Sequence, residues 1–204
     1  TKELTNFTPE KIFFNKIPVT YDQTKTCPTI IKHLKEVLSN ELDIPIMQEL
    51  FGYLLWKEEK MEKAFMFCGT GRNGKGKTLN ILQKFLGYEN CSALSLEEID
   101  TDPYAPAYLI NKLVNVGGDI GSKTLQNTQL FKKLRGRDNV SAQRKYKTQI
   151  DFINYAQFVF SCNETPYVND NSDGFWNSWV WIDFKVNFRD KKEIDTLSKE
   201  EIER

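Results

Sequence analysis

The sequence has little histidine and no paired cysteines, and both absences narrow the kinds of site that it can hold. His33 is the single histidine among 204 residues, and Cys27, Cys68, Cys91 and Cys162 form no CxxC pair. A structural zinc site needs clustered cysteine and histidine ligands, so no recognisable zinc motif is present. We therefore expect reduced cysteines and a cytoplasmic protein.

Long apolar runs are also missing. No run approaches the ~18 residues that indicate a membrane-spanning helix, and no secretory signal pattern stands at the start. We expect no membrane partner. The chain begins without methionine and closes on a charged, helix-like stretch, so we expect it to be part of a longer protein.

Net charge is absent too, because 28 lysines and arginines balance 28 aspartates and glutamates. The two signs are nevertheless separated along the chain. Residues 89–102 carry five acids and no base, whereas residues 121–150 carry one acid, Asp138, and eight bases: Lys123, Lys132, Lys133, Arg135, Arg137, Arg144, Lys145 and Lys147. The balanced total therefore hides a basic segment of the kind that a phosphate backbone attracts.

Apolar patterning divides the chain into a helical start and a mixed remainder. Two stripes at helical spacing, within 30–38 and 47–55, predict two packed helices, with Asp43 as the N-cap of the second. Further on, short apolar runs at 64–68, 113–116, 158–162 and 180–184 alternate with helical stretches. This pattern predicts an α/β fold: a small helical domain over residues 1–60, a core with a central parallel sheet over 61–190, and the start of a helical segment over 191–204.

A glycine-rich segment joins the first predicted strand to the helix after it. Its residues are Gly69, Thr70, Gly71, Arg72, Asn73, Gly74, Lys75, Gly76, Lys77 and Thr78. In such a P-loop, glycines let backbone N–H groups turn around phosphates, while a helix N-terminus and a lysine add positive charge. The position between strand and helix predicts a nucleotide-binding loop, with ATP and Mg²⁺ as cofactors.

Two registers of the P-loop pattern fit this segment. Gly71–Thr78 matches GxxxxGK[ST] in full and makes Lys77 the phosphate lysine and Thr78 the Mg²⁺ ligand. Gly69–Gly76 makes Lys75 the phosphate lysine but ends on glycine where the pattern has its hydroxyl. We favour Lys75, because the second register begins directly after the strand, as such loops normally do.

Two later apolar runs end in polar side chains suited to a phosphate site. Asp119 follows the run at 113–116 and would hold Mg²⁺ and polarise the attacking water. Asn163 follows the run at 158–162 and would orient that water. Ordinary turn chemistry is the alternative for both, since Asp119 stands in a GGDIG segment and Asn163 shortly precedes Pro166.

The basic residues after position 130 are candidates for DNA contact. Arg144, Lys145 and Lys147 surround Tyr146 between a helical stretch and an apolar strand, which indicates a hairpin or loop that carries charge outward. Cations bind the phosphate backbone and an aromatic ring stacks on a base, so we expect single-stranded DNA as a partner. A solvated basic face without a ligand is the alternative.

Together these segments resemble the superfamily 3 helicases, in the phage, plasmid and viral primase–helicase branch, over nearly the whole chain. Residues 16–22, 27–28 and 52–55 resemble the helical domain that precedes the branch's motor. The loop from Gly69 to Gly76 resembles its Walker A motif, which supports the Lys75 register. Asp119 stands where its Walker B acid does, although the branch usually has glutamate or an acidic pair there.

The resemblance continues through the basic segment and the last strands. Residues 132–138, which include Lys132 and Lys133, are similar to a KxLTGGD motif with arginine at two positions. Residues 144–147 match the basic hairpin that tracks DNA in the pore of the ring, and residues 158–166 match the FxxxNxxP sensor strand that ends in Asn163. Where the branch usually has an arginine finger, Asn177 and Ser178 stand instead, which puts strong ATPase activity in doubt.

The resemblance implies an ATPase core of the AAA+ type, working as a homo-oligomeric ring, usually a hexamer, that moves along single-stranded DNA. It also implies a primase or polymerase domain on the same full-length chain, and a viral, phage or plasmid source acting in the host cytoplasm. Arg135, Arg137 and Arg189 are the substitute candidates for the finger. Two other functions stay open: a P-loop kinase or non-translocating ATPase, and a nucleotide-switched DNA-binding initiator module with weak hydrolysis.

Overall fold

The structure is a computed structural model that describes residues 8–10, 12–38, 40–57, 61–120, 128–166, 168 and 172–188. The expected helical segment at 191–204 lies outside these residues, as do Lys123 and Arg189. Within the described part of the chain, no helix has the length and apolar character needed to cross a bilayer.

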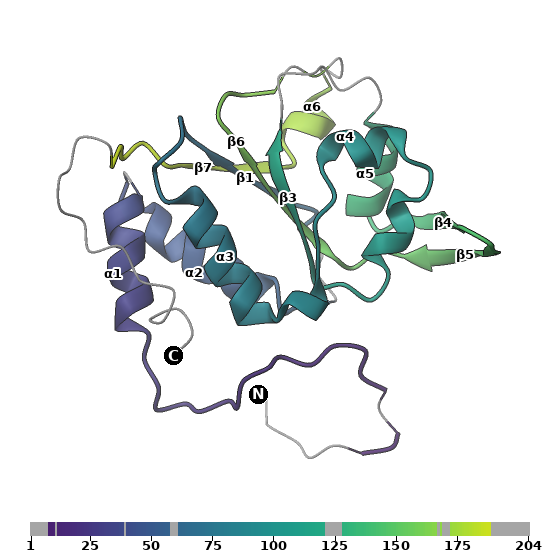
Figure 1. The fold of residues 1–204 in the computed structure, drawn as a ribbon, viewed down its shortest axis with the longest axis horizontal. Coiled ribbons are helices and arrows are strands. Elements are labelled where there is room, and N and C mark those ends of the chain that lie inside the picture. The colour runs from purple at the N-terminus through teal and green to yellow at the C-terminus, as the bar shows by residue number, and fades with distance from the viewer. Residues whose placement is uncertain are drawn as a thin grey trace.

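A five-stranded parallel sheet forms the centre of the fold (Figure 1). Its spatial order is β2 (Cys91–Ser92), β3 (Val114–Ile120), β6 (Gln157–Cys162), β1 (Ala64–Cys68) and β7 (Trp179–Asp183). The predicted α/β fold with a central parallel sheet is confirmed, and each of the four apolar runs overlaps one of these strands. The sequence missed β2 because two residues carry no periodic pattern.

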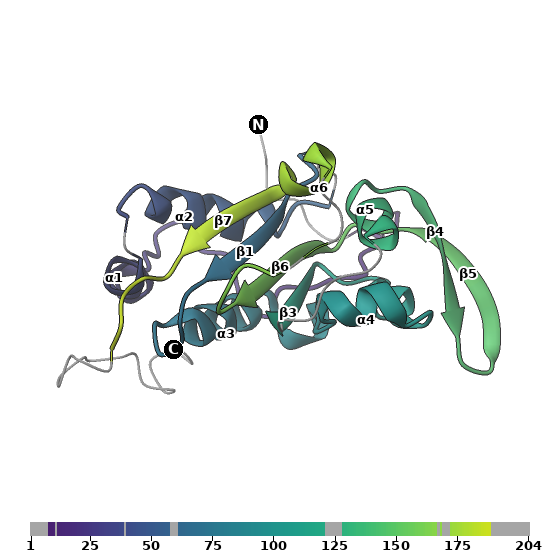
Figure 2. The same ribbon diagram turned by 90° about the horizontal axis from the view of Figure 1, so that it is seen from above.

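Helices cover both faces of this sheet (Figure 2). α1 (Pro28–Val37), α2 (Asp43–Tyr53) and α3 (Lys75–Leu86) share one apolar core with Phe65, Phe67 and Val159. α4 (Leu96–Thr101), α5 (Gln129–Arg135) and α6 (Asp173–Trp176), with the 3₁₀ turn η2 (Ala105–Leu109), share the other core with Phe158 and Phe160. A second 3₁₀ turn, η1 (Tyr88–Asn90), follows α3. Successive strand residues therefore face opposite helical layers, which is why these strands are apolar without a break.

Both helices predicted near the start of the chain are present, but one detail of the prediction is wrong. Asp43 is the first residue of α2 instead of its N-cap, because Leu42 occupies the cap position and no side chain caps the helix. α1 and α2 pack into the same core as β1, β6 and α3. The division of the chain at residue 60 stays a prediction.

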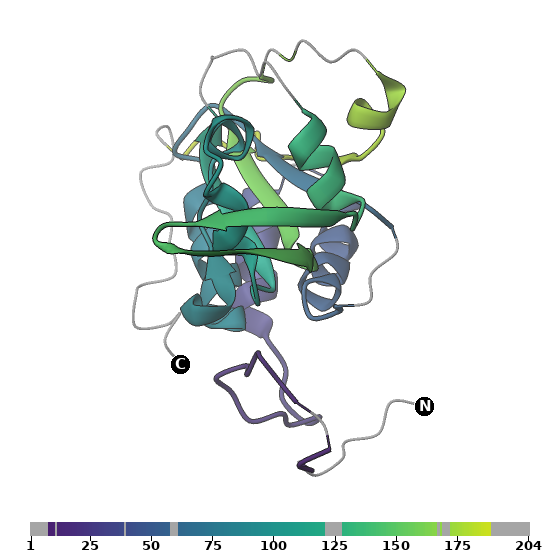
Figure 3. The same ribbon diagram turned by 90° about the vertical axis from the view of Figure 1, so that its right-hand side faces the viewer.

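A two-stranded antiparallel hairpin extends away from the sheet (Figures 2 and 3). It pairs β4 (Asn139–Arg144) with β5 (Lys147–Ile153), and Lys145 and Tyr146 form the turn. The sequence indicated a hairpin or loop in this region. At its base, buried Asn154 donates to the carbonyls of Leu134 (3.1 Å) and Ala156 (2.9 Å), which joins the end of α5 to the start of β6.

Candidate functional site

The glycine-rich segment connects the carboxyl end of β1 to α3. Gly74 has a φ of 90° and occupies the N-cap position of α3, a left-handed conformation that costs glycine little. Two backbone bonds fix the strand end of the loop: the Gly69 N–H donates to the Cys162 carbonyl of β6 (3.1 Å), and Phe184 N–H donates to the Cys68 carbonyl (2.7 Å). The loop therefore begins from three adjacent strand ends, those of β6, β1 and β7.

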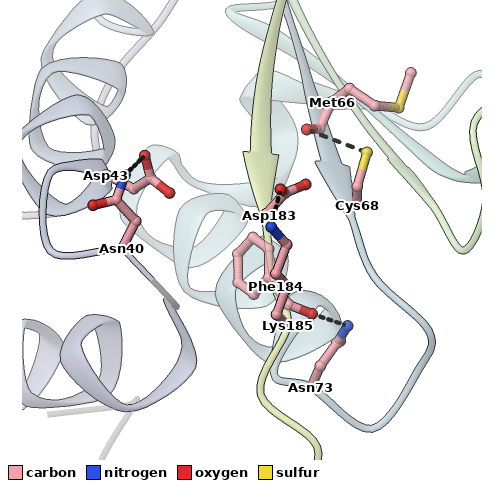
Figure 4. A network of polar contacts seen from close by, with 8 residues as sticks. All are labelled: Asn40, Asp43, Met66, Cys68, Asn73, Asp183, Phe184 and Lys185. Atoms are coloured by element: carbon pink, nitrogen blue, oxygen red, sulfur yellow. Dashed lines mark hydrogen bonds and ion pairs between the residues drawn. The ribbon is translucent and has the colours of Figure 1, made fainter.

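Asn73 holds the loop against the segment that follows β7. Its buried side-chain amide donates to the Phe184 carbonyl at 2.8 Å, the bond drawn in Figure 4, and its side-chain oxygen accepts from Lys75 N–H at 3.4 Å. A Cβ on Gly69 would overlap both the Asn73 amide and the Phe184 carbonyl. Sequence reasoning gave Asn73 no role of its own, because its partner Phe184 is more than a hundred residues away.

The structure brings together two of the predicted site residues. Lys75, only 5% exposed, donates from Nζ to the Gly69 carbonyl and to Asn163 Oδ1, the latter at 3.0 Å. Asn163 follows β6 directly, next to the strand that carries the loop. The second lysine, Lys77, is half-buried, and its charge acts on His33 of α1.

A hollow of about 420 Å³ lies over the loop. It is lined by the loop residues from Gly71 to Lys77, which include three basic side chains, together with Ser161 and Asn163. Ser161 was missed by sequence reasoning, which read it as part of an apolar strand. Its position two residues before Asn163 is the signal that could have found it. A larger hollow, about 700 Å³, lies along α1 from Thr26 to Glu36 and is distant in sequence from the loop.

Asp119 lies in β3, which pairs with one edge of β6, whereas β1, the strand that leads into the loop, pairs with the other edge. Its Cα partner across β6 is Ser161, and the β3–β6 register shifts between Gly117 and Asp119. The backbone position of Asp119 is thus level with the strand end that precedes Asn163. The topology places the loop, Asn163 and Asp119 at the carboxyl ends of three neighbouring strands.

Thr78 has a different environment from the other candidates. Its buried hydroxyl donates to the Gly74 carbonyl at 3.0 Å and lies 3.0 Å from His33 Nε2 in α1, and it does not line the hollow. Burial, and secondarily the Lys77 charge, lowers the pKa of His33 from 6.5 to about 4. His33 is therefore neutral at pH 7.

Two thiols lie on the other face of the sheet below the loop. Cys68 Sγ and Cys162 Sγ are 3.2 Å apart at the ends of β1 and β6. The hydrogen bond between them, followed by burial, raises the pKa of the Cys68 thiol. Both cysteines are free thiols in this structure.

The six predicted DNA-binding residues divide between two elements. Arg144, Lys145, Tyr146 and Lys147 form the tip of the hairpin, where Tyr146 is 94% exposed. Arg144 donates to the Thr148 carbonyl at 2.9 Å, and Lys145 Nζ lies 5.4 Å from the centroid of the Tyr146 ring. The other two, Lys132 and Lys133, lie on α5, where Lys132 donates to Ser172 Oγ at 3.0 Å.

Tyr104, which sequence reasoning missed, faces the hairpin tip. It borders a hollow of about 380 Å³ with residues 143–147 and Gln149, and no acid lines this hollow. The eight bases of residues 121–150 were visible in the sequence, but Tyr104 lies before them, just after the acidic residues 89–102, and is brought to the hairpin by the packing of η2 against β4. Two aromatic rings and three bases thus meet at one place.

The positions expected to hold an arginine finger have structural roles. Ser178 is buried and donates to the Phe175 carbonyl, and the Asn177 carbonyl accepts from Lys63 Nζ at 2.6 Å. Of the substitute candidates, Arg135 donates from Nη1 to the Glu62 carbonyl, and Arg137 lies near it at the base of the hairpin.

One known family and two viral proteins are similar to this chain. The model of a family of unknown function, DUF5906, matches residues 67–177. Two curated viral proteins, both named as candidate helicases, are similar: 184R of Invertebrate iridescent virus 6 (27% identity over 96% of this chain) and L207/L206 of Acanthamoeba polyphaga mimivirus (26% over 69%). The chain spans 22% and 15% of their lengths.

Solved structures show the same fold. The C-terminal region of NrS-1 matches 97% of this chain with a TM-score of 0.68 and 21% identity, and JCV helicase matches 77% with a TM-score of 0.53 and 15% identity. The chain covers 46% and 43% of those structures. The resemblance to viral superfamily 3 helicases is confirmed, and at these identities the solved structures establish the fold alone.

Replacing Gly69 by alanine tests the close approach of the loop to Asn73 and Phe184. We expect the free energy of unfolding to fall by roughly 1–3 kcal/mol, the usual cost of overpacking, because the Phe184 carbonyl is backbone and cannot rotate away. Gly76→Ala is the matched control: nothing lies within 4 Å of a Cβ there, and a helical alanine should stabilise by about 0.5–1 kcal/mol. Urea denaturation measures both, and equal stabilities would contradict the packing described.

The depressed pKa of His33 predicts acid sensitivity. Since the unfolded chain binds a proton near pH 6.5 and the folded chain only near pH 4, stability is fully present above pH 6.5 and falls as the pH drops towards 4. His33 should account for about 3 kcal/mol of this loss. The measurement is urea denaturation from pH 7 to pH 4 beside His33→Gln, which should lose less stability over that interval; identical pH slopes would refute the prediction.

Proposed function

The chain belongs to DUF5906, a family of unknown function, and from the loop that lies within the matched segment we propose that it is an ATP-hydrolysing helicase motor moving on single-stranded DNA. Its viral relatives and its fold support a helicase-related function. The observation that carries the finer proposal is the bond between Lys75 and Asn163, which joins the loop to the end of the neighbouring strand.

The residues at the loop fit ATP with Mg²⁺. Backbone N–H groups at the start of α3 and the Lys75 ammonium would hold the phosphates. Among the described residues, no group of three or more histidine, cysteine, aspartate or glutamate side chains could hold a metal alone. Mg²⁺ at nucleotide sites usually takes one or two carboxylates plus phosphate oxygens and waters, so Asp119 is the proposed carboxylate. Mg²⁺ would neutralise the charge that develops on the transferred phosphoryl group.

We assign the phosphate contact to Lys75 and the orientation of the attacking water to Asn163. The Lys75 ammonium lies inside the site with Asn163, whereas the charge of Lys77 acts on α1. Thr78, the metal ligand of the other register, is bonded to Gly74 and His33. These contacts support the register Gly69–Gly76.

The hairpin is the proposed contact to DNA, because its tip combines cations with exposed Tyr146, and exposed Tyr104 borders the same hollow. β5 leads through Asn154 into β6, and β6 ends at Asn163. A rigid strand therefore connects the proposed DNA contact to the proposed hydrolysis site. For hydrolysis to drive movement, the nucleotide states must differ in their affinity for DNA, and this connection offers a route for that difference.

We further propose a homo-oligomeric ring, a hexamer, with a primase or polymerase domain on the full-length chain, in the host cytoplasm of a virus, phage or plasmid. A second candidate function is a nucleotide-switched initiator module with weak hydrolysis. It is favoured by one observation: Asn177 and Ser178 occupy the expected finger positions. Slow turnover with intact ATP and DNA binding would favour the second candidate.

The first test is ATP hydrolysis with and without single-stranded DNA. We expect DNA to stimulate turnover and Lys75→Ala to lower kcat/KM by about a hundredfold or more, the scale of removing a charged transition-state contact. Lys77→Ala, the matched control on the same helix, should stay within about threefold of wild type. A larger loss in Lys77→Ala than in Lys75→Ala would reverse the register, and a wild-type chain that binds no ATP would refute the proposal.

The hairpin proposal predicts distinct effects of its aromatic and basic residues on DNA affinity. Tyr146→Ala and Tyr104→Ala should each weaken binding to single-stranded DNA by about 1–3 kcal/mol through lost base stacking. Arg144→Ala should reduce the slope of log K against log salt by about 0.7, one phosphate contact. Tyr21→Ala removes an exposed tyrosine (65%, against 94% for Tyr146 and 42% for Tyr104) that is distant from the hairpin in sequence, and it should have no effect. Fluorescence anisotropy at several salt concentrations measures all four, and unchanged affinities would exclude the hairpin as the contact.

A further inference from the structure

The proposed register leaves the nucleotide's Mg²⁺ without its usual loop ligand. A P-loop normally presents a serine or threonine hydroxyl directly after the phosphate lysine, and here that residue is Gly76. Thr78 cannot substitute without leaving its bonds to Gly74 and His33, and neither Thr78 nor exposed Thr70 lines the hollow over the loop. Of the residues that line this hollow, Ser161 alone carries a hydroxyl.

Ser161 is positioned on the correct face of the correct strand. Its neighbours Phe160 and Cys162 pack into the core beneath α4 and α5, while Val159 packs into the core beneath α3. Because side chains alternate along a strand, Ser161 shares the face of Val159, the side from which α3 and the loop approach. It is 4% exposed and borders the same hollow as Lys75 and Asn163.

The register also places Ser161 opposite the backbone position of Asp119, the residue proposed to supply the carboxylate. Its Cα partners are Phe67 in β1, two residues before the loop, and Asp119 in β3. The backbone of Ser161 therefore lies between the strand that leads into the loop and the backbone position of Asp119. Hydroxyl and carboxylate oxygens are the hard ligands that Mg²⁺ prefers.

We infer that Ser161 supplies the hydroxyl ligand for the Mg²⁺ of bound nucleotide, in place of the loop residue at position 76. This inference rests on the proposed ATP site. It makes β6 contribute both the metal-binding hydroxyl and the water-orienting amide of Asn163, so that both groups move with the strand that connects to the hairpin. Ser161 is then a ligand of the metal and not a residue that touches the transferred phosphoryl group.

The test measures binding of a fluorescent ATP analogue as Mg²⁺ is titrated, so that no hydrolysis is needed. In Ser161→Ala, the Mg²⁺ concentration for half-maximal tight binding should rise about tenfold, while weak binding in EDTA stays unchanged. Ser92→Ala is the matched control, since it removes a buried serine, bonded to Asn115 at 2.9 Å, from an edge strand of the same sheet. It should titrate like wild type.

Gly76→Ser supplies the decisive comparison, because no atom lies within 4 Å of a Cβ at position 76 and the new hydroxyl has room. In the Ser161→Ala background, Gly76→Ser should return the Mg²⁺ concentration for half-maximal binding to the wild-type value. In the wild-type background, the same substitution should change that concentration by less than about twofold. Such non-additivity is expected of two groups that serve one role. Equal gains in both backgrounds, or an unchanged titration in Ser161→Ala, would overturn the inference.

Two further measurements separate possible failures. If thermal denaturation shows that Ser161→Ala is not folded, Ser161→Cys replaces it in the test. Cysteine nearly keeps the side-chain volume and exchanges the hard oxygen for soft sulfur, so this variant should show the same rise in Mg²⁺ requirement. If wild type binds no analogue at any Mg²⁺ concentration, the proposed ATP site itself fails. If wild type binds and Lys75→Ala does not, the site stands and the titrations decide the role of Ser161.

Discussion

Lys75 carries its charge into a nearly closed site, and the oxygens of Gly69 and Asn163 receive it. An ammonium taken out of water costs several kcal/mol unless acceptors replace its hydration. Here one acceptor belongs to the loop strand and the other to its neighbour, so satisfying the charge fixes the loop against the end of β6. The close approach of Gly69 to Asn73, and the bond from Asn73 to Phe184, hold the other side of the loop to β7. The rest of the candidate site depends on this arrangement.

The central position of β6 gives the molecule its internal connection. It pairs with β1 on one side and β3 on the other, so its carboxyl end lies between the glycine-rich loop and Asp119. Its amino end begins at the base of the hairpin, where Asn154 bonds to Leu134 and Ala156. A buried strand between two buried neighbours is stiff, because shifting it would break ladders on both edges. Asn163 and the hairpin are therefore joined through one buried strand.

The helices before the sheet also contact α3, the helix that follows the glycine-rich loop. His33 of α1 lies 3.0 Å from Thr78 of α3, and burial holds that histidine neutral. The same contact keeps the Thr78 hydroxyl away from the hollow over the loop. Gly74, at the start of α3, likewise lies against Val37 of α1, where a Cβ would overlap the valine side chain. The early helices thus take part in shaping the loop and do more than cover one face of the sheet.

The sequence by itself determined the four long strands of the sheet, the first three helices and the glycine-rich loop, and it indicated a hairpin or loop at the basic segment. Each is a local pattern: apolar runs, helical spacing, or glycines between strand and helix. It also indicated Lys75 and Asn163, although not that they touch. Only the tertiary structure decided which candidates meet. Lys75 and Lys77 point about 200° apart around α3, and their spacing does not say which of them faces the site. The strand order brings Ser161 in β6 and Asn163 after it beside a loop some ninety residues earlier. Those contacts arise from packing between segments distant in sequence, where no local pattern carries the information.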